Sequence, residues 1–174
     1  MPNASTRPKI PLSRSPMLVL LEAAALTGLV LGLILVAANW SALPERIPHH
    51  FNFRGTPDAW GRKKILLLLP VVAFILYVGL TVAQRLPRHF NFLGPVDEGS
   101  AADQYRLARA LIVCLKAEVL WFFTFLVWGT IRVGLEEASV LPMWGTLTFG
   151  GAIGMTLMVY FFAAFRTCRK KAKV

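Results

Sequence analysis

The strongest constraint on the fold is the length of four almost uninterrupted apolar runs. They cover residues 17–39, 65–83, 110–131 and 140–165. At about 1.5 Å per residue, a helix of this length crosses the roughly 30 Å hydrocarbon layer of a bilayer. With 56% hydrophobic residues among 174, the chain has more apolar surface than a soluble domain of this size can bury. The sequence therefore predicts an all-α integral membrane protein, a bundle of four transmembrane helices.

The other segments flank or connect this single four-span domain, residues 17–165. Residues 1–16 combine prolines with basic residues, which predicts a mobile basic cytoplasmic leader. Residues 166–174 form a basic cytoplasmic tail. A cleaved signal peptide is the alternative for the first run, but that run exceeds the usual apolar core of about 7 to 15 residues.

The distribution of Lys and Arg predicts the orientation. With the N-terminus inside, the inner segments hold 12 Lys and Arg, three in the leader, four between the second and third runs and five in the tail, whereas the outer segments hold 6. Because inner loops of bacterial membrane proteins are enriched in these residues, we expect a multi-pass protein of the inner (plasma) membrane with both termini in the cytoplasm. Arg62, Lys63 and Lys64 lie outside in this arrangement and run against the rule.

Two connecting segments contain near copies of one motif. Residues 46–58 and 85–97 match at eight of thirteen positions with an offset of 39 residues, and all three histidines of the chain lie inside the copies. Each copy follows one apolar run, so the copies are expected on opposite sides of the membrane, as in inverted-topology repeats. An old tandem duplication whose copies now cap helix ends is the alternative.

Each copy is expected to form a turn-rich His-Phe-Asn-Phe loop at the membrane interface. Proline favours extended backbone before the aromatic residues, so Phe51 and Phe53 are expected to reach the headgroup boundary while Asn52 points away. Glycine permits a turn, and histidine titrates near neutral pH. The candidate partner-binding residues of the first loop are Pro48, His49, His50, Phe51, Asn52, Gly55, Asp58 and Lys63. Those of the second copy are Pro87, His89, Phe90, Asn91 and Gly94.

Three charged residues and one pair of glycines lie inside the runs. Glu22, Lys116 and Glu118 are costly in hydrocarbon. Their side chains either extend to the membrane surface, or Glu22 and Lys116 form an ion pair between helices. Gly150 and Gly154 have GxxxG spacing, which allows close approach of helices within the bundle or between two copies of the chain in a homo-oligomer.

Other function classes lack their motifs. The net charge of +10 comes without a recognition motif or a basic amphipathic face, so no nucleic-acid partner is expected. One loop offers oxygen and nitrogen donors for zinc without a diagnostic spacing, so we expect no metal and no cofactor. These donors are Glu45, His49, His50 and Asp58. No GxSxG elbow and no cysteine near a histidine segment indicate hydrolase chemistry, so no catalytic residue is assigned.

The first loop also carries a set of residues typical of one family. In chain order they are Trp40, Leu43, Pro44, Ile47, Pro48, His50, Phe51, Asn52, Gly55, Asp58 and Lys63. With the continuation from Asp103 to Arg109 and then Lys116, this pattern resembles the uncharacterised membrane domain at the N-terminal end of Sdp-type bacterial immunity proteins. The chain is similar to stand-alone members of that family, without the C-terminal immunity domain. The resemblance implies a bacterial membrane protein, and in the immunity proteins themselves protection from a secreted toxin and recruitment of a repressor.

Together these features predict a non-enzymatic membrane protein that senses or binds a protein or peptide partner at the membrane surface. The loop of residues 40–64 is the expected recognition element. A small inverted-repeat transporter or channel is one alternative, although few polar residues converge near the bilayer midplane. A metal-binding membrane accessory subunit is the other.

Overall fold

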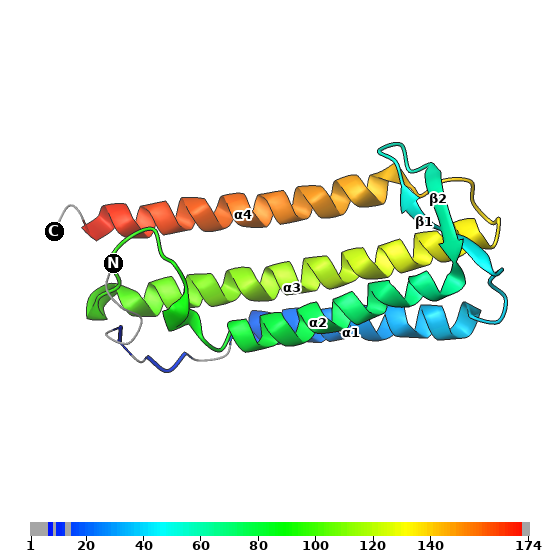
Figure 1. Ribbon diagram of the computed structural model, residues 1–174. Coiled ribbons are helices and arrows are strands. Elements are labelled where there is room, and N and C mark those ends of the chain that lie inside the picture. The colour runs from blue at the N-terminus through cyan, green and yellow to red at the C-terminus, as the bar shows by residue number, and fades with distance from the viewer. Residues whose placement is uncertain (1–6, 9, 13–14, 172–174) are drawn as a thin grey trace.

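The computed structural model describes residues 7–8, 10–12 and 15–171. The described chain forms a bundle of long helices with a β-hairpin at one end (Figure 1). In chain order the elements are α1 (Pro16–Asn39), β1 (Arg46–Phe51), β2 (Pro57–Arg62), the 3₁₀ segment η2 (Lys63–Leu67), α2 (Leu68–Ala83), the 3₁₀ segment η3 (Pro87–His89), α3 (Glu98–Gly134) and α4 (Met143–Lys171). We call the end with the hairpin the hairpin end, and the end where α4 finishes the terminal end.

Four helical segments are long and apolar enough to cross a membrane, counting η2 with α2, and this is compatible with a membrane protein. The all-α prediction is corrected in one respect, because residues 46–62 pair as two strands. Helix α1 covers the first apolar run, and η2 together with α2 covers the second. The third helix begins at Glu98 rather than near residue 110, because Asp97 and Ser100 form a capping box that starts it early.

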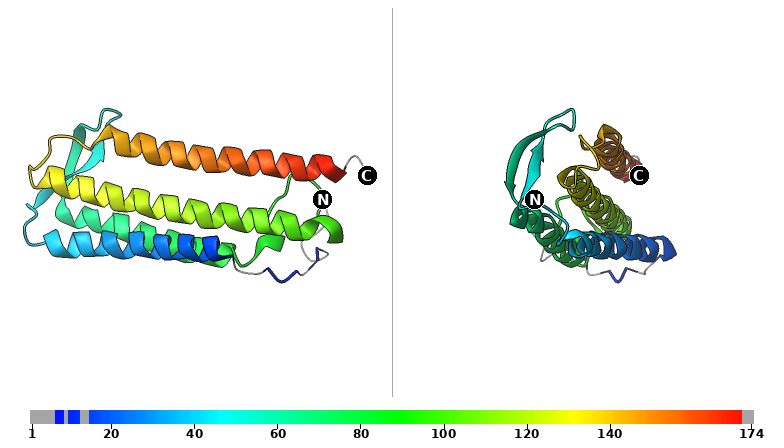
Figure 2. Two further views of the ribbon diagram at one scale, coloured as in Figure 1. Left: turned by 180° about the vertical axis from the view of Figure 1, so that it is seen from behind. Right: turned by 90° about the vertical axis from the view of Figure 1, so that its right-hand side faces the viewer.

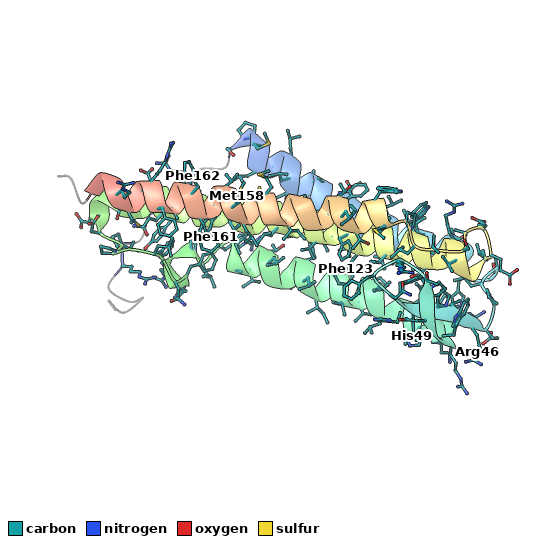
Figure 3. The ribbon with its side chains drawn as sticks, turned by 90° about the horizontal axis from the view of Figure 1, so that it is seen from above. Arg46, His49, Phe123, Met158, Phe161 and Phe162 are labelled. Atoms are coloured by element: carbon teal, nitrogen blue, oxygen red, sulfur yellow. The ribbon has the colours of Figure 1, made fainter. Side chains whose placement is uncertain are left out.

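Helix α3 is the central element and packs against α1, α2 and α4. In the end-on view, α4 forms a layer of its own beside α3 (Figure 2). One buried cluster joins α1, α2 and α3 at Ala25, Leu29, Ala73, Ala117 and Leu120. By contrast, large apolar side chains on α4 remain exposed, among them Met158, Phe161 and Phe162 (Figure 3). Exposed apolar surface on this scale is typical of a face that contacts lipid.

Close packing between α1 and α3 depends on two glycines, Gly28 and Gly32 on α1. An added Cβ at Gly28 would lie 3.3 Å from the Trp121 ring, and one at Gly32 would lie 3.4 Å from Thr124 Oγ1. The short approach lets α3 side chains reach α1 carbonyls. Trp121 Nε1 donates to the Ala24 carbonyl at 3.0 Å, and Thr124 Oγ1 lies 2.7 Å from the Gly28 carbonyl. The GxxxG spacing of the first span is therefore the one that packs inside the bundle.

The described part of the leader contacts the terminal end. Arg7 Nη1 donates to the carbonyls of Arg88 and Phe90 at 2.8 and 2.6 Å, and Tyr105 donates its hydroxyl to the Pro8 carbonyl at 3.2 Å. These contacts attach residues that the sequence analysis expected to be mobile. The predicted mobility of residues 1–6, 9 and 13–14 lies outside the described residues.

Candidate functional site

The first motif copy forms the β-hairpin. Strands β1 and β2 are antiparallel, with Pro48 opposite Trp60 and His50 opposite Ala59. The register shifts between Pro48 and His50, so His49 has no partner across the ladder. Such a bulge changes the direction of the side chains beside it. The ring of His49 lies over β2, with Nδ1 3.1 Å from the position that a Cβ on Gly61 would occupy. Figure 3 shows His49 on the hairpin beside α3.

The turn of the hairpin is built around Asn52. Its side-chain Oδ1 accepts hydrogen bonds from the backbone N–H of Arg54 at 2.9 Å and of Thr56 at 3.1 Å. Its backbone N–H donates to the Thr56 carbonyl at 2.9 Å. Asparagine suits this position because its short amide replaces a backbone partner in a turn. Asn52 therefore stabilises the turn, and its predicted direction away from the headgroup boundary stays a prediction.

Gly55 completes the turn and fixes the hairpin to the rest of the protein. Its φ of +76° lies in the left-handed region, as the turn prediction required. Its carbonyl accepts a hydrogen bond from the Leu141 N–H at 2.8 Å, so the hairpin tip contacts the connection between α3 and α4. A Cβ at Gly55 would collide with the Leu141 carbonyl. Both the backbone conformation and the close approach require glycine here.

His50 and Asp58 form a pair across the hairpin. His50 Nδ1 lies 2.5 Å from Asp58 Oδ1, and the two side chains are 67% and 44% exposed. The contact holds the imidazole in one orientation, while its exposure leaves the rest of the ring accessible to a partner. Within the described residues, no group of three or more His, Cys, Asp or Glu side chains could hold a metal ion. Glu45, one of the donors considered for zinc, instead pairs with Lys63 at 3.2 Å.

A cavity of about 540 Å³ lies between the hairpin, α3 and the start of α4. Polar groups from the motif face apolar walls from the helices. The residues that line it are His49, His50, Phe51, Asn52, Phe53, Gly55, Asp58, Phe122, Leu126, Leu141, Met143 and Thr146. Phe51 is half-buried against this cavity whereas Phe53, in the turn, is fully exposed. Both rings line the cavity, but Phe51 ends the strand while Phe53 lies in the turn. Their predicted position at the headgroup boundary stays a prediction.

The base of the hairpin is buried in the bundle. Pro48 and Ile47 are buried, and Ile47 packs with Leu43 in a cluster that includes residues of α1 and α3. Lys63 holds the other side of the base. Its Nζ lies 3.4 Å from the Leu43 carbonyl and 5.6 Å from the centre of the Trp40 ring. These contacts anchor the hairpin and leave its turn and outer face exposed.

The second motif copy lies at the opposite end of the bundle and has a different conformation (Figure 1). Pro87 to His89 form the short segment η3, and the chain then continues without strand pairing to α3. His89 and Asn91 are exposed, and the Phe90 carbonyl is held by Arg7. Gly94 is a close contact, since an added Cβ would lie 2.8 Å from Cys168 Sγ on α4. Unlike Gly55, it does not adopt a positive φ.

Each charged side chain inside the apolar runs has a hydrogen-bond partner, and two of them form an ion pair. Lys116 is fully buried and donates to both carboxylate oxygens of Glu22, at 2.7 and 2.6 Å, and to Thr81 Oγ1 at 3.0 Å. The interhelical pair is therefore the correct alternative for Glu22 and Lys116, and it joins α1, α2 and α3. Glu118 accepts a hydrogen bond from Thr156 Oγ1 at 2.6 Å, which joins α3 to α4.

Gly150 and Gly154 are exposed on α4, and an added Cβ at either position would meet no other described group within 4 Å. The predicted use of this pair within the bundle is therefore wrong. Contact with a second copy of the chain stays a prediction.

Residues 27–74 match the family described as Domain of unknown function (DUF1648). The matched segment runs from the middle of α1 through the hairpin and η2 into α2, so it contains the first motif copy and not the second. No curated protein and no solved structure matches the chain. The domain family is uncharacterised, so the match assigns no activity.

Proposed function

We propose that this protein is a non-enzymatic protein of a bacterial plasma membrane that binds a protein or peptide partner at the hairpin end. The observation that carries the proposal is the cavity between the hairpin and the helices. Imidazole, amide and carboxylate groups face apolar walls there, and Phe53, which also lines the cavity, is fully exposed. Mixed apolar and polar linings of this kind suit a peptide or protein side chain that brings both kinds of surface.

The charge distribution supports an orientation with this cavity outside the cell. With 12 Lys and Arg in the leader, the second connection and the tail, against 6 in the other connections, both termini lie in the cytoplasm. The resemblance of residues 40–64 to the domain in Sdp-type immunity proteins supports the same arrangement, in which an external loop meets a secreted molecule.

A transport function has less support. An inverted-repeat transporter builds its site from two repeats with related structures. Here the two motif copies adopt different conformations, one paired as strands and the other beginning with a 3₁₀ turn.

The test uses two single-cysteine variants, Phe53→Cys and Leu93→Cys, with Cys114 and Cys168 replaced by alanine. Both positions are exposed, one in each motif copy. A membrane-impermeant maleimide should label Phe53→Cys in intact cells, and Leu93→Cys only after the membrane is opened. A photo-crosslinker at position 53 should then give an adduct of defined mass that the same group at position 93 does not give. Labelling of both cysteines from the same side would overturn the orientation, and equal adducts from both positions would overturn the hairpin end as the binding site.

A further inference from the structure

One carboxyl inside the membrane-length helices has no cationic partner. Glu118 on α3 is half-buried, and its Oε1 lies 2.6 Å from Thr156 Oγ1 on α4. Its Oε2 is buried and has no hydrogen-bond partner among the described residues. No ion pair involves Glu118 in that part of the chain. Partner binding at the hairpin end does not use this carboxyl.

The carboxyl lies far from both ends of the bundle. Its partner Thr156 is 13 residues after the first residue of α4, Met143, and 15 residues before the last, Lys171. At 1.5 Å per residue, about 20 Å of helix lies on either side. The hydrocarbon layer extends about 15 Å from its midplane, so a bilayer centred on α4 encloses this contact. A glutamate side chain is too short to reach the membrane surface from there.

The other glutamate inside the apolar runs has the partner that Glu118 lacks. Glu22 on α1 accepts from Lys116 Nζ with both oxygens, at 2.7 and 2.6 Å. Lys116 is two residues from Glu118 along α3, and side chains at this spacing leave a helix on nearly opposite sides. Its ammonium also donates to Thr81 on α2. The positive charge is therefore shared with α1 and α2 and does not face α4.

The described titratable groups on the facing surfaces of α3 and α4 supply no positive charge. Cys114 lies one turn before Glu118 on α3, and Tyr160 lies one turn after Thr156 on α4. A thiol and a phenol carry no charge at neutral pH. Towards the hairpin end, the two helices meet through aromatic rings. In these surroundings an ionised carboxylate without a counter-ion is far more costly than a neutral carboxylic acid.

We propose that Glu118 binds a proton in the membrane interior and remains a neutral carboxylic acid while α4 packs on α3. The contact with Thr156 suits this state, because a hydroxyl accepts from a protonated carboxyl as readily as it donates to a carboxylate. Loss of the proton leaves a carboxylate that needs water or a cation, and α4 must move from α3 to admit either. The proposal requires the helices to lie in a bilayer, but it is independent of partner binding at the hairpin end.

The experiment labels the purified full chain in lipid nanodiscs with dicyclohexylcarbodiimide, an apolar reagent that enters hydrocarbon. A protonated carboxyl gives its proton to one nitrogen of the reagent while its oxygen bonds to the central carbon. The acyl group then moves to the other nitrogen, so the stable product contains every atom of both reactants. Peptide mass spectrometry should find this adduct on Glu118, at a level that falls as the pH rises from neutral. Glu118→Gln should remove it.

Glu22 is the internal control in the same sample. A nearby cation favours the charged form of a carboxyl by a factor of about ten or more, so Glu22 should carry roughly tenfold less label than Glu118. The side chain of Glu22 is 31% exposed, so burial would not account for its protection. Infrared spectra give a second measurement without the reagent. The difference between the wild type and Glu118→Gln at neutral pH should show the C=O stretch of a protonated carboxyl.

Any of three results would overturn the proton site. Carboxylate bands in the infrared difference would show that Glu118 is ionised in the packed protein. Equal labelling of Glu22 and Glu118 would show that the ion pair does not distinguish them. Labelling of Glu118 by a charged, water-soluble carbodiimide as fast as that of the exposed Asp103 would show that water reaches the site. Because no partner is added, none of these results depends on the function proposed for the hairpin end.

Discussion

The two motif copies, residues 46–58 and 85–97, share eight of thirteen positions and yet adopt different structures at opposite ends of the bundle. The difference follows from single positions where the copies diverge. In the first copy the Thr56 N–H donates to Asn52 Oδ1 and closes the hairpin turn. The equivalent position in the second copy is Pro95, which has no N–H to donate. The same asparagine therefore closes a turn in one copy and cannot make that bond in the other.

The last matched residue shows the same dependence on context. Asp58 contacts His50 across the hairpin, whereas its equivalent, Asp97, accepts from the Ser100 N–H and begins α3. The residues after each aspartate decide which role is available. Ala59 and Trp60 continue a strand, while Glu98 to Ser100 form the first turn of a helix. The repeated motif therefore supplies the same side chains in both copies, and the residues that follow it decide which local structure forms.

The largest difference in stability is expected between substitutions of the two equivalent glycines, Gly55 and Gly94. Gly55→Val forces a β-branched residue into a left-handed conformation, at about 1–3 kcal/mol, and into the Leu141 carbonyl, so a total loss of about 3 kcal/mol or more is expected. Gly94→Val meets only the movable Cys168 side chain, and we expect less than half of that loss. Thermal unfolding in detergent measures both. Arg54→Ala is an exposed control that should change little, and equal tolerance of the Arg54 and Gly55 changes would contradict a specified turn.

Substitutions at the equivalent positions Thr56 and Pro95 test why the two motif copies adopt different structures. Thr56→Pro removes the donor to Asn52 Oδ1, so we expect a loss of about 1–2 kcal/mol and faster amide exchange across β1 and β2. Pro95→Thr keeps the carbonyl that accepts from Gln104 Nε2, so exchange around η3 should be unchanged. Hydrogen exchange followed by mass spectrometry resolves the two regions. Unchanged protection of the hairpin in Thr56→Pro would show that the asparagine bond does not hold the turn.

The smallest effect on stability is expected from substitutions of the equivalent histidines, His50 and His89. These two residues are therefore compared by partner binding. The His50–Asp58 contact is exposed, so His50→Gln should alter the free energy of unfolding by about 1 kcal/mol or less. The amide still offers a donor to Asp58, so the photo-crosslinked adduct at position 53 should largely persist, whereas His50→Ala should reduce it. His89→Gln should leave the adduct unchanged. Equal loss in His50→Gln and His50→Ala would show that the partner requires the imidazole ring itself.

Length and composition predicted the helices well, because a membrane-length apolar run has few other uses. A turn at Gly55 was also predicted, since its neighbours are typical of a turn, and the structure adds that this glycine has a positive φ. The hairpin was not, because Ala59, Trp60 and Gly61 do not alternate in polarity as an ordinary strand does. Of the two uses predicted for Gly150 and Gly154, close packing within the bundle is not found, and contact with a second copy stays a prediction. Spacing alone does not tell which face of a helix meets a neighbour, and Gly28 and Gly32 had the same spacing as Gly150 and Gly154.

The equivalent glycines of the two copies contact opposite ends of one helix. Gly55 binds the backbone at Leu141, just before α4, and Gly94 lies against Cys168 near its finish. The intervening helical segment spans about 40 Å at 1.5 Å per residue, close to the full thickness of a bilayer with its headgroups. The two contacts therefore fix the length of α4 between the two motif copies. We therefore expect a membrane much thinner or thicker than this length to tilt α4 and to strain one of the two contacts.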